Sequence, residues 1–118
     1  MLIGILQPSY MPWLGFFEQM ARVDAFVLYD DVQYDKQGWR NRNRIKNSQG
    51  IQWLSVPILT KGKRSQLINQ ARIDPTNKWD LKHLASLETN YKKAIYFDHF
   101  YCQIEPFFKK KWSYLLDL

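Results

Sequence analysis

Two short apolar runs near the N-terminus constrain the fold of this chain most. The runs Leu2–Leu6 and Ala25–Tyr29 show no polar alternation, which is typical of strands that are buried on both faces. Between them, Leu14–Arg22 places apolar residues at helical spacing. Strand, helix and strand over so short a stretch predict a βαβ unit with central parallel strands in an α/β fold.

A β-hairpin is predicted in the middle of the chain. Trp39–Lys46 and Ile51–Ile58 have the composition of strands, and Asn47–Gly50 between them supplies a turn with a glycine available for positive φ. A polar loop, Lys61–Ser65, follows the hairpin. After this loop, Leu67–Ile73 predicts a further strand.

Two helices are predicted in the C-terminal part. Asp74 and Pro75 form a helix start, with Asp as the N-cap and Pro at the first helical position. A last helix after Asp98 is expected to break near Pro106, because proline cannot donate an intrahelical hydrogen bond. With 118 residues, the whole chain is expected to be a single domain.

Composition excludes several classes of protein. Hydrophobic residues make up 46 % of the chain and charged residues 24 %, which indicates a globular protein rather than a disordered one. The single cysteine, Cys102, excludes an internal disulfide and is interpreted as a buried thiol. No run reaches the roughly 18–20 apolar residues of a membrane span, and no signal peptide is evident. A cytoplasmic location is therefore expected.

Charge is concentrated in the middle of the chain. Residues 36–73 carry nine bases and no acid, whereas residues 1–35 carry five acids and one base; the net charge of the chain is +6. The basic block suits a phosphate, a sugar nucleotide, an anionic lipid or a nucleic acid. His83 and His99 lack metal-ligand spacing and are expected to be packed or surface residues. The sequence assigns neither a metal nor a cofactor.

The segment from Trp39 to Lys46 is the strongest candidate binding element. If it is extended, one face carries Arg40, Arg42, Arg44 and Lys46, and the other carries Trp39, Asn41, Asn43 and Ile45. A solvated basic edge strand is one interpretation. The other is recognition of phosphate or carboxylate, favoured by arginine in three positions and by asparagines that need partners when buried. The predicted substrate-binding residues here are Lys36, Arg40, Asn41, Arg42, Asn43 and Lys46.

Two further candidates follow the ends of the predicted parallel strands, where α/β folds bind ligands. Gln7–Trp13 is either structural, with its prolines fixing the backbone, or a loop whose Gln7 and Tyr10 line a substrate pocket. Asp30 and Asp31 either cap a turn and meet solvent, or one acts as a general base or as an outer ligand of hydrated magnesium. The catalytic prediction is this aspartate pair.

A family resemblance covers nearly the whole chain. In order along the sequence stand the blocks QPSYMPWLGFF, VDAFVLYDDVQYDKQGWRNRNRIK, IQWLSVPI, NKWDLKHL and NYKKAIYF. This pattern resembles the WbqC-like family, a bacterial group of O-antigen and other surface-polysaccharide gene clusters. Many members carry His where this chain has Leu6. Members are typically longer, so the resemblance implies an N-terminal half, a domain incomplete at its C-terminus.

Three functional interpretations remain open at this point. The first is an enzyme of surface-polysaccharide synthesis; the resemblance implies a transferase that places an amino acid such as glycine on a sugar. Its partner would be a phosphorylated or nucleotide-activated small molecule. The second is a basic module that binds single-stranded nucleic acid. The third is an inactive, truncated product that self-associates through an exposed apolar face. The first is favoured, because the acidic N-terminal third would repel a polyanion.

Overall fold

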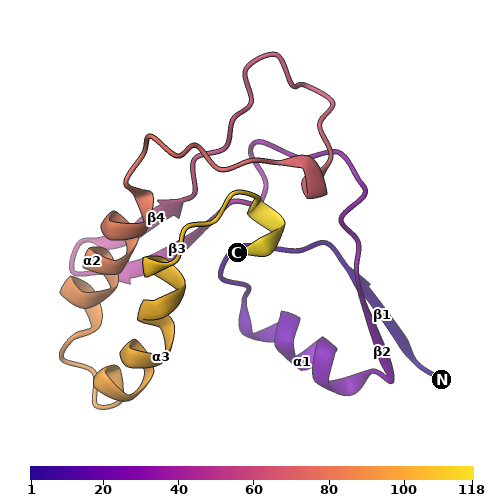
Figure 1. Cartoon of the computed structure of the whole chain (residues 1–118). Coiled ribbons are helices and arrows are strands. Elements are labelled where there is room, and N and C mark those ends of the chain that lie inside the picture. The colour runs from indigo at the N-terminus through magenta and orange to yellow at the C-terminus, as the bar shows by residue number, and fades with distance from the viewer.

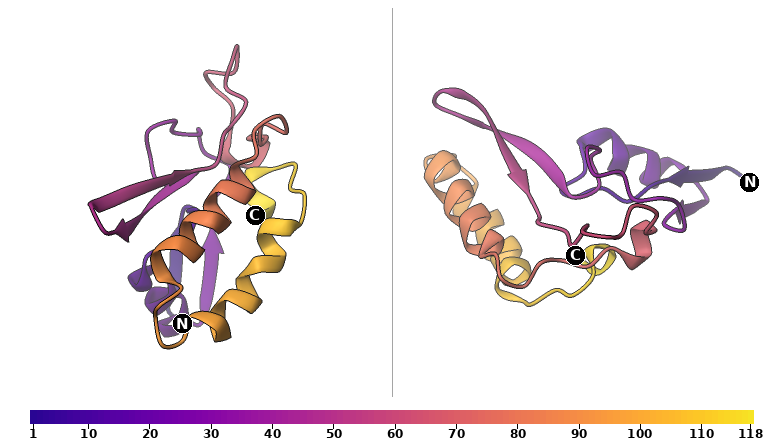
Figure 2. Two further views of the ribbon diagram at one scale, coloured as in Figure 1. Left: turned by 90° about the vertical axis from the view of Figure 1, so that its left-hand side faces the viewer. Right: turned by 90° about the horizontal axis from the view of Figure 1, so that it is seen from above.

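The chain folds into an N-terminal βαβ unit and a C-terminal unit of hairpin and helices, joined by long loops (Figure 1). The computed structural model describes all residues from Met1 to Leu118. Viewed from above, the two units lie at opposite ends of the molecule, with the C-terminus between them (Figure 2). The radius of gyration is 15.5 Å, larger than the about 13.5 Å expected for a compact domain of this length. The architecture is therefore open.

The βαβ unit consists of β1 (Ile3–Leu6), α1 (Leu14–Arg22) and β2 (Ala25–Leu28). The two strands pair in parallel, with Ile3 opposite Ala25 and Leu6 opposite Leu28. The predicted α/β fold with a parallel strand pair is confirmed. Phe16 of α1 is buried and packs edge-on against Phe26 of β2, with 5.4 Å between the ring centroids. The helix thus covers part of one face of the sheet.

The prediction that these strands are buried on both faces is wrong. Ile3, Ile5 and Val27 are 48 %, 60 % and 45 % exposed. Because side chains alternate along a strand, these residues lie on the face opposite Phe26 and α1. The sheet contains only β1 and β2, and this face is left largely uncovered. An apolar sheet face therefore meets solvent.

We expect this face to drive self-association of the 118-residue chain. Contiguous apolar patches larger than a few hundred Å² are rare on monomers. Sedimentation velocity should show oligomers, and a dye for apolar surface should bind. Ile5→Lys should reduce both signals, whereas Leu81→Lys, at an exposed position in the C-terminal unit, should not. A monomer that binds no dye would contradict the proposal that this domain is incomplete.

The second unit begins with an antiparallel hairpin of β3 (Arg42–Asn47) and β4 (Gly50–Ser55). The predicted hairpin is confirmed, and Gly50 has a φ of 129°, which favours glycine. The strands are shorter than predicted at their outer ends. Before Arg42, the carbonyls of Trp39 and Arg40 accept hydrogen bonds from the Tyr10 N–H instead of joining the ladder. The predicted strand Leu67–Ile73 contains a short 3-10 helix, η1 (Ile68–Gln70), with isolated bridges on either side.

Two helices and a short 3-10 turn complete the chain: α2 (Trp79–Tyr91), α3 (Phe97–Lys109) and η2 (Leu115–Asp117). Helix α2 does not begin at Asp74 and Pro75. The Asp74 carboxylate instead accepts hydrogen bonds from the Thr76 N–H and hydroxyl, which closes a separate turn. None of the helices combines the length and the apolar character that crossing a bilayer requires.

Helix α3 differs from prediction in two ways. It continues through Pro106, and the Lys110 N–H still donates to the Pro106 carbonyl at 3.1 Å. Proline removes one donor from a helix but leaves its own carbonyl available, so the last turn forms. Cys102 is exposed rather than buried, because it lies on the solvent side of this helix.

The core belongs almost entirely to the second unit. Thirteen buried residues form one cluster: Tyr10, Tyr34, Ile45, Leu54, Val56, Ile68, Ala71, Ile73, Trp79, Leu84, Leu87, Phe108 and Leu115. The only member from the first unit's span is Tyr10, in the loop after β1. This loop therefore connects the βαβ unit to the main core, and it also carries the candidate site.

Candidate functional site

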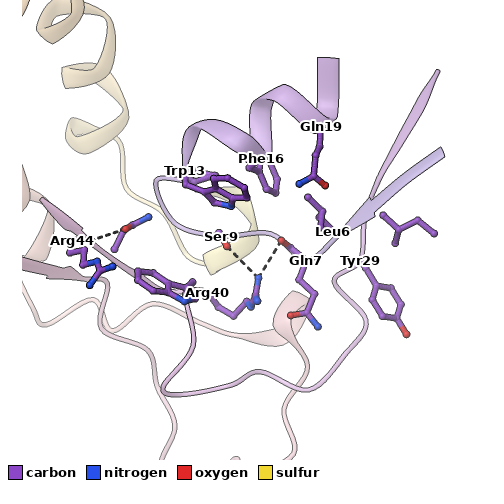
Figure 3. Close-up of a pocket in the computed structure, with 13 residues that line it drawn as sticks. Leu6, Gln7, Ser9, Trp13, Phe16, Gln19, Tyr29, Arg40 and Arg44 are labelled. Carbon is purple, nitrogen blue, oxygen red and sulfur yellow. Dashed lines mark hydrogen bonds between the residues drawn. The ribbon is translucent and has the colours of Figure 1, made fainter. Parts of the chain in front are cut away.

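A cavity of about 750 Å³ lies where the two units meet. It is bounded by the carboxyl ends of β1 and β2, the loop after β1, one side of α1 and the start of β3 (Figure 3). The lining residues are Ile5, Leu6, Gln7, Ser9, Pro12, Trp13, Phe16, Gln19, Tyr29, Trp39, Arg40, Asn43 and Arg44. This volume is typical of sites that bind small molecules. The position matches the expectation that ligands bind beyond the ends of parallel strands.

Arg40 holds the loop that forms one wall of the cavity. Its Nη1 donates to the carbonyls of Gln7 and Pro8, at 3.2 and 2.9 Å, and lies 3.3 Å from Ser9 Oγ (Figure 3). Burial lowers the pKa of Arg40, and the nearby Asp35 carboxylate opposes this shift. A guanidinium has five N–H donors, and these contacts use one nitrogen. The others are available to a ligand in the cavity.

Asn43, in β3, also holds this loop. Its Nδ2 donates to the Met11 carbonyl at 2.6 Å and to the Tyr10 carbonyl at 3.3 Å, and its Oδ1 accepts from the Arg44 N–H. Met11 has a φ of 48°, a left-handed conformation that costs a non-glycine residue free energy. The amide contacts of Asn43 compensate for this strain by satisfying the backbone of the loop.

Tyr10 anchors the loop in the core. Its hydroxyl lies 2.8 Å from Nδ1 of His83 on α2, and both side chains are buried. Burial raises the pKa of Tyr10, so the phenol stays protonated and is able to donate to the imidazole. Burial also lowers the pKa of His83 to about 4, although the Ser55 backbone and the Asp80 carboxylate oppose this shift. Near pH 7, Tyr10 and His83 thus form a neutral hydrogen-bonded pair.

The electrostatic character of the cavity comes from two arginines. Arg40 and Arg44 line it together with polar side chains such as Gln7 and Gln19, and the lining contains no Asp, Glu, His or Cys. Neither arginine forms an ion pair anywhere in the chain. Two guanidiniums without a direct ion-pair partner beside an open cavity favour an anionic ligand with planar, bidentate acceptors.

The structure brings three of the ten predicted site residues into this cavity: Gln7, Arg40 and Asn43. Tyr10 and Asn41 are buried instead. Asn41 donates to the Val56 carbonyl at 2.7 Å and receives the Val56 N–H through its own carbonyl. Its side-chain oxygen is buried without a partner. Asn41 therefore aligns the hairpin with the segment that follows it.

The aspartate pair does not line the cavity. The chain turns after Tyr29 and runs along η1, where the carbonyls of Asp30 and Val32 accept the Asn69 and Ile68 N–H groups. Asp31 is exposed. The pair therefore leaves the strand end, and Tyr29 takes the position at the cavity instead. No group of three or more His, Cys, Asp or Glu side chains gathers anywhere in the chain.

The basic side chains of the hairpin do not form the predicted four-residue ladder. Arg42, Arg44 and Lys46 alternate along β3, opposite Ser55, Trp53 and Ile51 of β4. Arg40 lies before the strand and reaches the loop, so it leaves this row. Trp39 was predicted on the other face but lies on the basic face. There it stacks against Trp53, with 5.4 Å between the ring centroids. Arg42 also donates to the Gln37 carbonyl, and Lys36 is exposed.

Several lining residues were not predicted as site residues. Phe16 and Gln19 of α1, and Trp13 directly before this helix, approach the cavity (Figure 3), and their i, i+3, i+6 spacing places them on the same side of it. That spacing was readable in the sequence, but an apolar helix face more often predicts core. Here the helix covers only part of a two-stranded sheet, so the N-terminal end of the face stays open.

The fold and the site together define an α/β domain with an open, arginine-lined cavity at the carboxyl ends of its parallel strands. Residues 7–118 match the model of the WbqC-like protein family, and the chain belongs to that family. It is 50 % identical over 95 residues to Uncharacterized protein Rv1507c of Mycobacterium tuberculosis. The match covers 80 % of this chain and 41 % of that relative, so it spans less than half of the relative's length. No solved structure matches the chain.

Proposed function

We propose that this domain binds a phosphorylated sugar, free or nucleotide-activated, for a transfer step in O-antigen or other surface-polysaccharide synthesis in the cytoplasm. The observation that carries the proposal is the pair Arg40 and Arg44 in a cavity without a carboxylate. The aromatic walls support it, because Trp13 and Tyr29 offer flat surfaces to a sugar ring. The transferred group expected from the family resemblance is an amino acid such as glycine.

The proposal assigns binding, rather than proton transfer, to the lining residues. A transfer to a hydroxyl or amine needs a general base within hydrogen-bond reach of the reacting atom. The lining holds no Asp, Glu, His, Lys or Cys side chain, and its one ionisable acid is the phenol of Tyr29. Asp30, which directly follows the lining residue Tyr29, stays the candidate base, with Asp31 as its alternative. Either carboxylate would have to reach a substrate that extends out of the cavity.

Arg44→Ala is the sharpest test of the binding proposal. Arg44 is exposed and holds no loop carbonyl, so its removal should leave the unfolding free energy nearly unchanged. A hydrogen bond to a charged group contributes about 1.5–3 kcal/mol, so the affinity for glucose 1-phosphate or UDP-glucose should fall at least about tenfold. Isothermal titration calorimetry would measure both ligands.

The matched control is Arg64→Ala, in the polar loop outside the cavity. It removes the same charge and should leave binding unchanged. Equal small losses for the two variants would return Arg44 to the role of a solvated basic residue. No binding of any phosphorylated sugar by the unaltered chain would contradict the proposal itself.

A nucleic-acid-binding module is the second candidate. The observation that favours it is the row Arg42, Arg44 and Lys46 beside the exposed pair Trp39 and Trp53. Such a binder loses affinity steeply with salt, in proportion to the phosphates it contacts. Every basic residue along the row would then contribute similarly, whereas the cavity proposal requires Arg40 and Arg44 to dominate.

A further inference from the structure

Trp39 and Trp53 form an exposed aromatic surface beside the cavity, which we call the indole platform. The rings are tilted by 35° to one another and are 43 % and 46 % exposed. Two guanidiniums lie over them: Arg42 is 4.7 Å from the Trp53 ring centroid, and Arg44 is 5.4 Å from that of Trp39. Residues 36–73 contain no acid, so these charges lack a neighbouring carboxylate along the chain.

Trp53 lies in the ladder opposite Arg44, but the hairpin leaves much of the platform exposed. Trp39 precedes the paired residues, which run from Arg42 opposite Ser55 to Asn47 opposite Gly50. The buried face of the hairpin is held by Ile45 and Leu54. Trp39 contributes neither to the strand ladder nor to the buried core, and 43 % of its surface stays in water, which is unfavourable for an apolar ring. A ligand that covers the platform would recover this free energy.

The platform and the cavity are one continuous surface, because Trp39 and Arg44 belong to both. A ligand with its phosphate at Arg40 and Arg44 therefore has an aromatic surface within reach of its next group. We propose that the ligand is a nucleotide whose base stacks on the Trp39–Trp53 platform while its phosphate group binds Arg40 and Arg44 in the cavity. This inference rests on the proposed function and narrows it to nucleotide-activated substrates.

The indole platform also determines how selective the site is among bases. Stacking on an aromatic side chain accepts every base, since each has a π face. The groups beside the platform are flexible guanidiniums and the exposed Ser55 hydroxyl, and no buried amide faces it to select one base edge. Affinity should therefore follow the stacked ring area, so that a purine nucleotide such as GDP binds more tightly than UDP.

The test compares GDP, UDP and glucose 1-phosphate on the unaltered chain and on Trp53→Leu, by calorimetry at constant salt. Trp53 belongs to the platform but not to the cavity lining, so the two parts of the ligand can be separated. Trp53→Leu should weaken GDP about tenfold and leave glucose 1-phosphate unchanged. Trp53→Phe should restore most of the GDP affinity. The control is Ile51→Ala, an exposed residue farther along the same face of β4.

Each other outcome overturns the inference. If glucose 1-phosphate binds as tightly as GDP, or if Trp53→Leu weakens both equally, the platform does not take the base, and the proposed function stands without it. If neither ligand binds the unaltered chain, the proposed function fails and the inference fails with it. If oligothymidylate binds more tightly than GDP and loses affinity steeply with salt, the surface belongs to a nucleic-acid binder instead.

Discussion

Acidifying the protein from pH 6.5 to pH 4 is expected to lower its unfolding free energy by up to about 3 kcal/mol, because His83 is buried in its neutral form. Its imidazole lies among the rings of Trp79, Tyr10 and Phe108, with centroid separations of 5.3, 5.6 and 6.4 Å. A cation in this position loses its hydration, and the Asp80 carboxylate and the Ser55 backbone offset only part of this loss. Unfolding releases the ring into water, where it binds a proton.

The sign follows from the two pKa values of His83, about 4 in the folded chain and 6.5 as the ordinary value. Between them the unfolded chain binds more protons than the folded one, so stability falls as the pH falls through this window. The contribution of neutral His83 to the unfolding free energy is complete above pH 6.5. Below pH 4, further acidification causes no further loss of stability through His83. Asp74 is separable, because the hydroxyl and amide of Thr76 lower its pKa and place its titration below the window.

Urea unfolding at several pH values would measure this dependence. The matched variant is His83→Asn, whose side-chain oxygen can accept the Tyr10 hydroxyl proton but does not titrate. This variant should be less stable than the unaltered chain at pH 7. Its unfolding free energy should also change less between pH 6.5 and pH 4. If the unfolding free energy of the variant depends on pH as steeply as that of the unaltered chain, other groups cause the loss of stability in acid. His83 is then not buried as a neutral ring.

Arg40→Ala is expected to lower both stability and ligand affinity, unlike Arg44→Ala. The guanidinium of Arg40 donates to two loop carbonyls and contacts Ser9. Its removal leaves these acceptors without a partner in a half-buried position, at a cost of about 1.5–3 kcal/mol in unfolding free energy. The loop then loses its fixed position, so the affinity for a phosphorylated sugar should fall more than tenfold.

Arg40→Lys separates charge from geometry. It keeps the positive charge but offers a single nitrogen, which cannot bridge the loop and also face a ligand. Stability should recover in part, whereas binding should not. Asn43→Ala should lower stability by about 1–2 kcal/mol without removing a charge, and a double mutant with Arg40→Ala should show coupling, because both residues hold one loop. Additive effects would show that the two contacts act independently.

The sequence was sufficient for those elements that depend on local pattern. The apolar runs at Leu2–Leu6 and Ala25–Tyr29 predicted the parallel pair, and Asn47–Gly50 predicted the hairpin turn. Burial of the strands was not predictable, since it depends on what packs over them. The start of α2 was mispredicted because an Asp-Pro pair also suits a turn, and the Thr76 hydroxyl selects that alternative.

The location of the candidate site was predictable from the sequence, but the residues that line it were not. The loop after the first strand and the arginine-rich segment were both identified from the sequence. The exchange of faces between Trp39 and Arg40 was not, because strand alternation applies only where the ladder forms, and that begins at Arg42. The partner of Tyr10 lies 73 residues away in sequence, beyond the range of any local pattern. The role of Tyr10 as an anchor rather than a ligand contact follows from that distant residue.

The clamping of the loop also determines when the cavity can exist during synthesis of the chain. The groups that hold Gln7 and Met11 are Arg40 and Asn43, which are 33 and 32 residues further along. A nascent chain that ends before them has the loop sequence but nothing to balance the left-handed backbone at Met11. The wall of the cavity forms only when the hairpin docks, and such distant contacts form late because their loops cost entropy to close. A nascent βαβ unit alone would therefore be unable to hold a ligand.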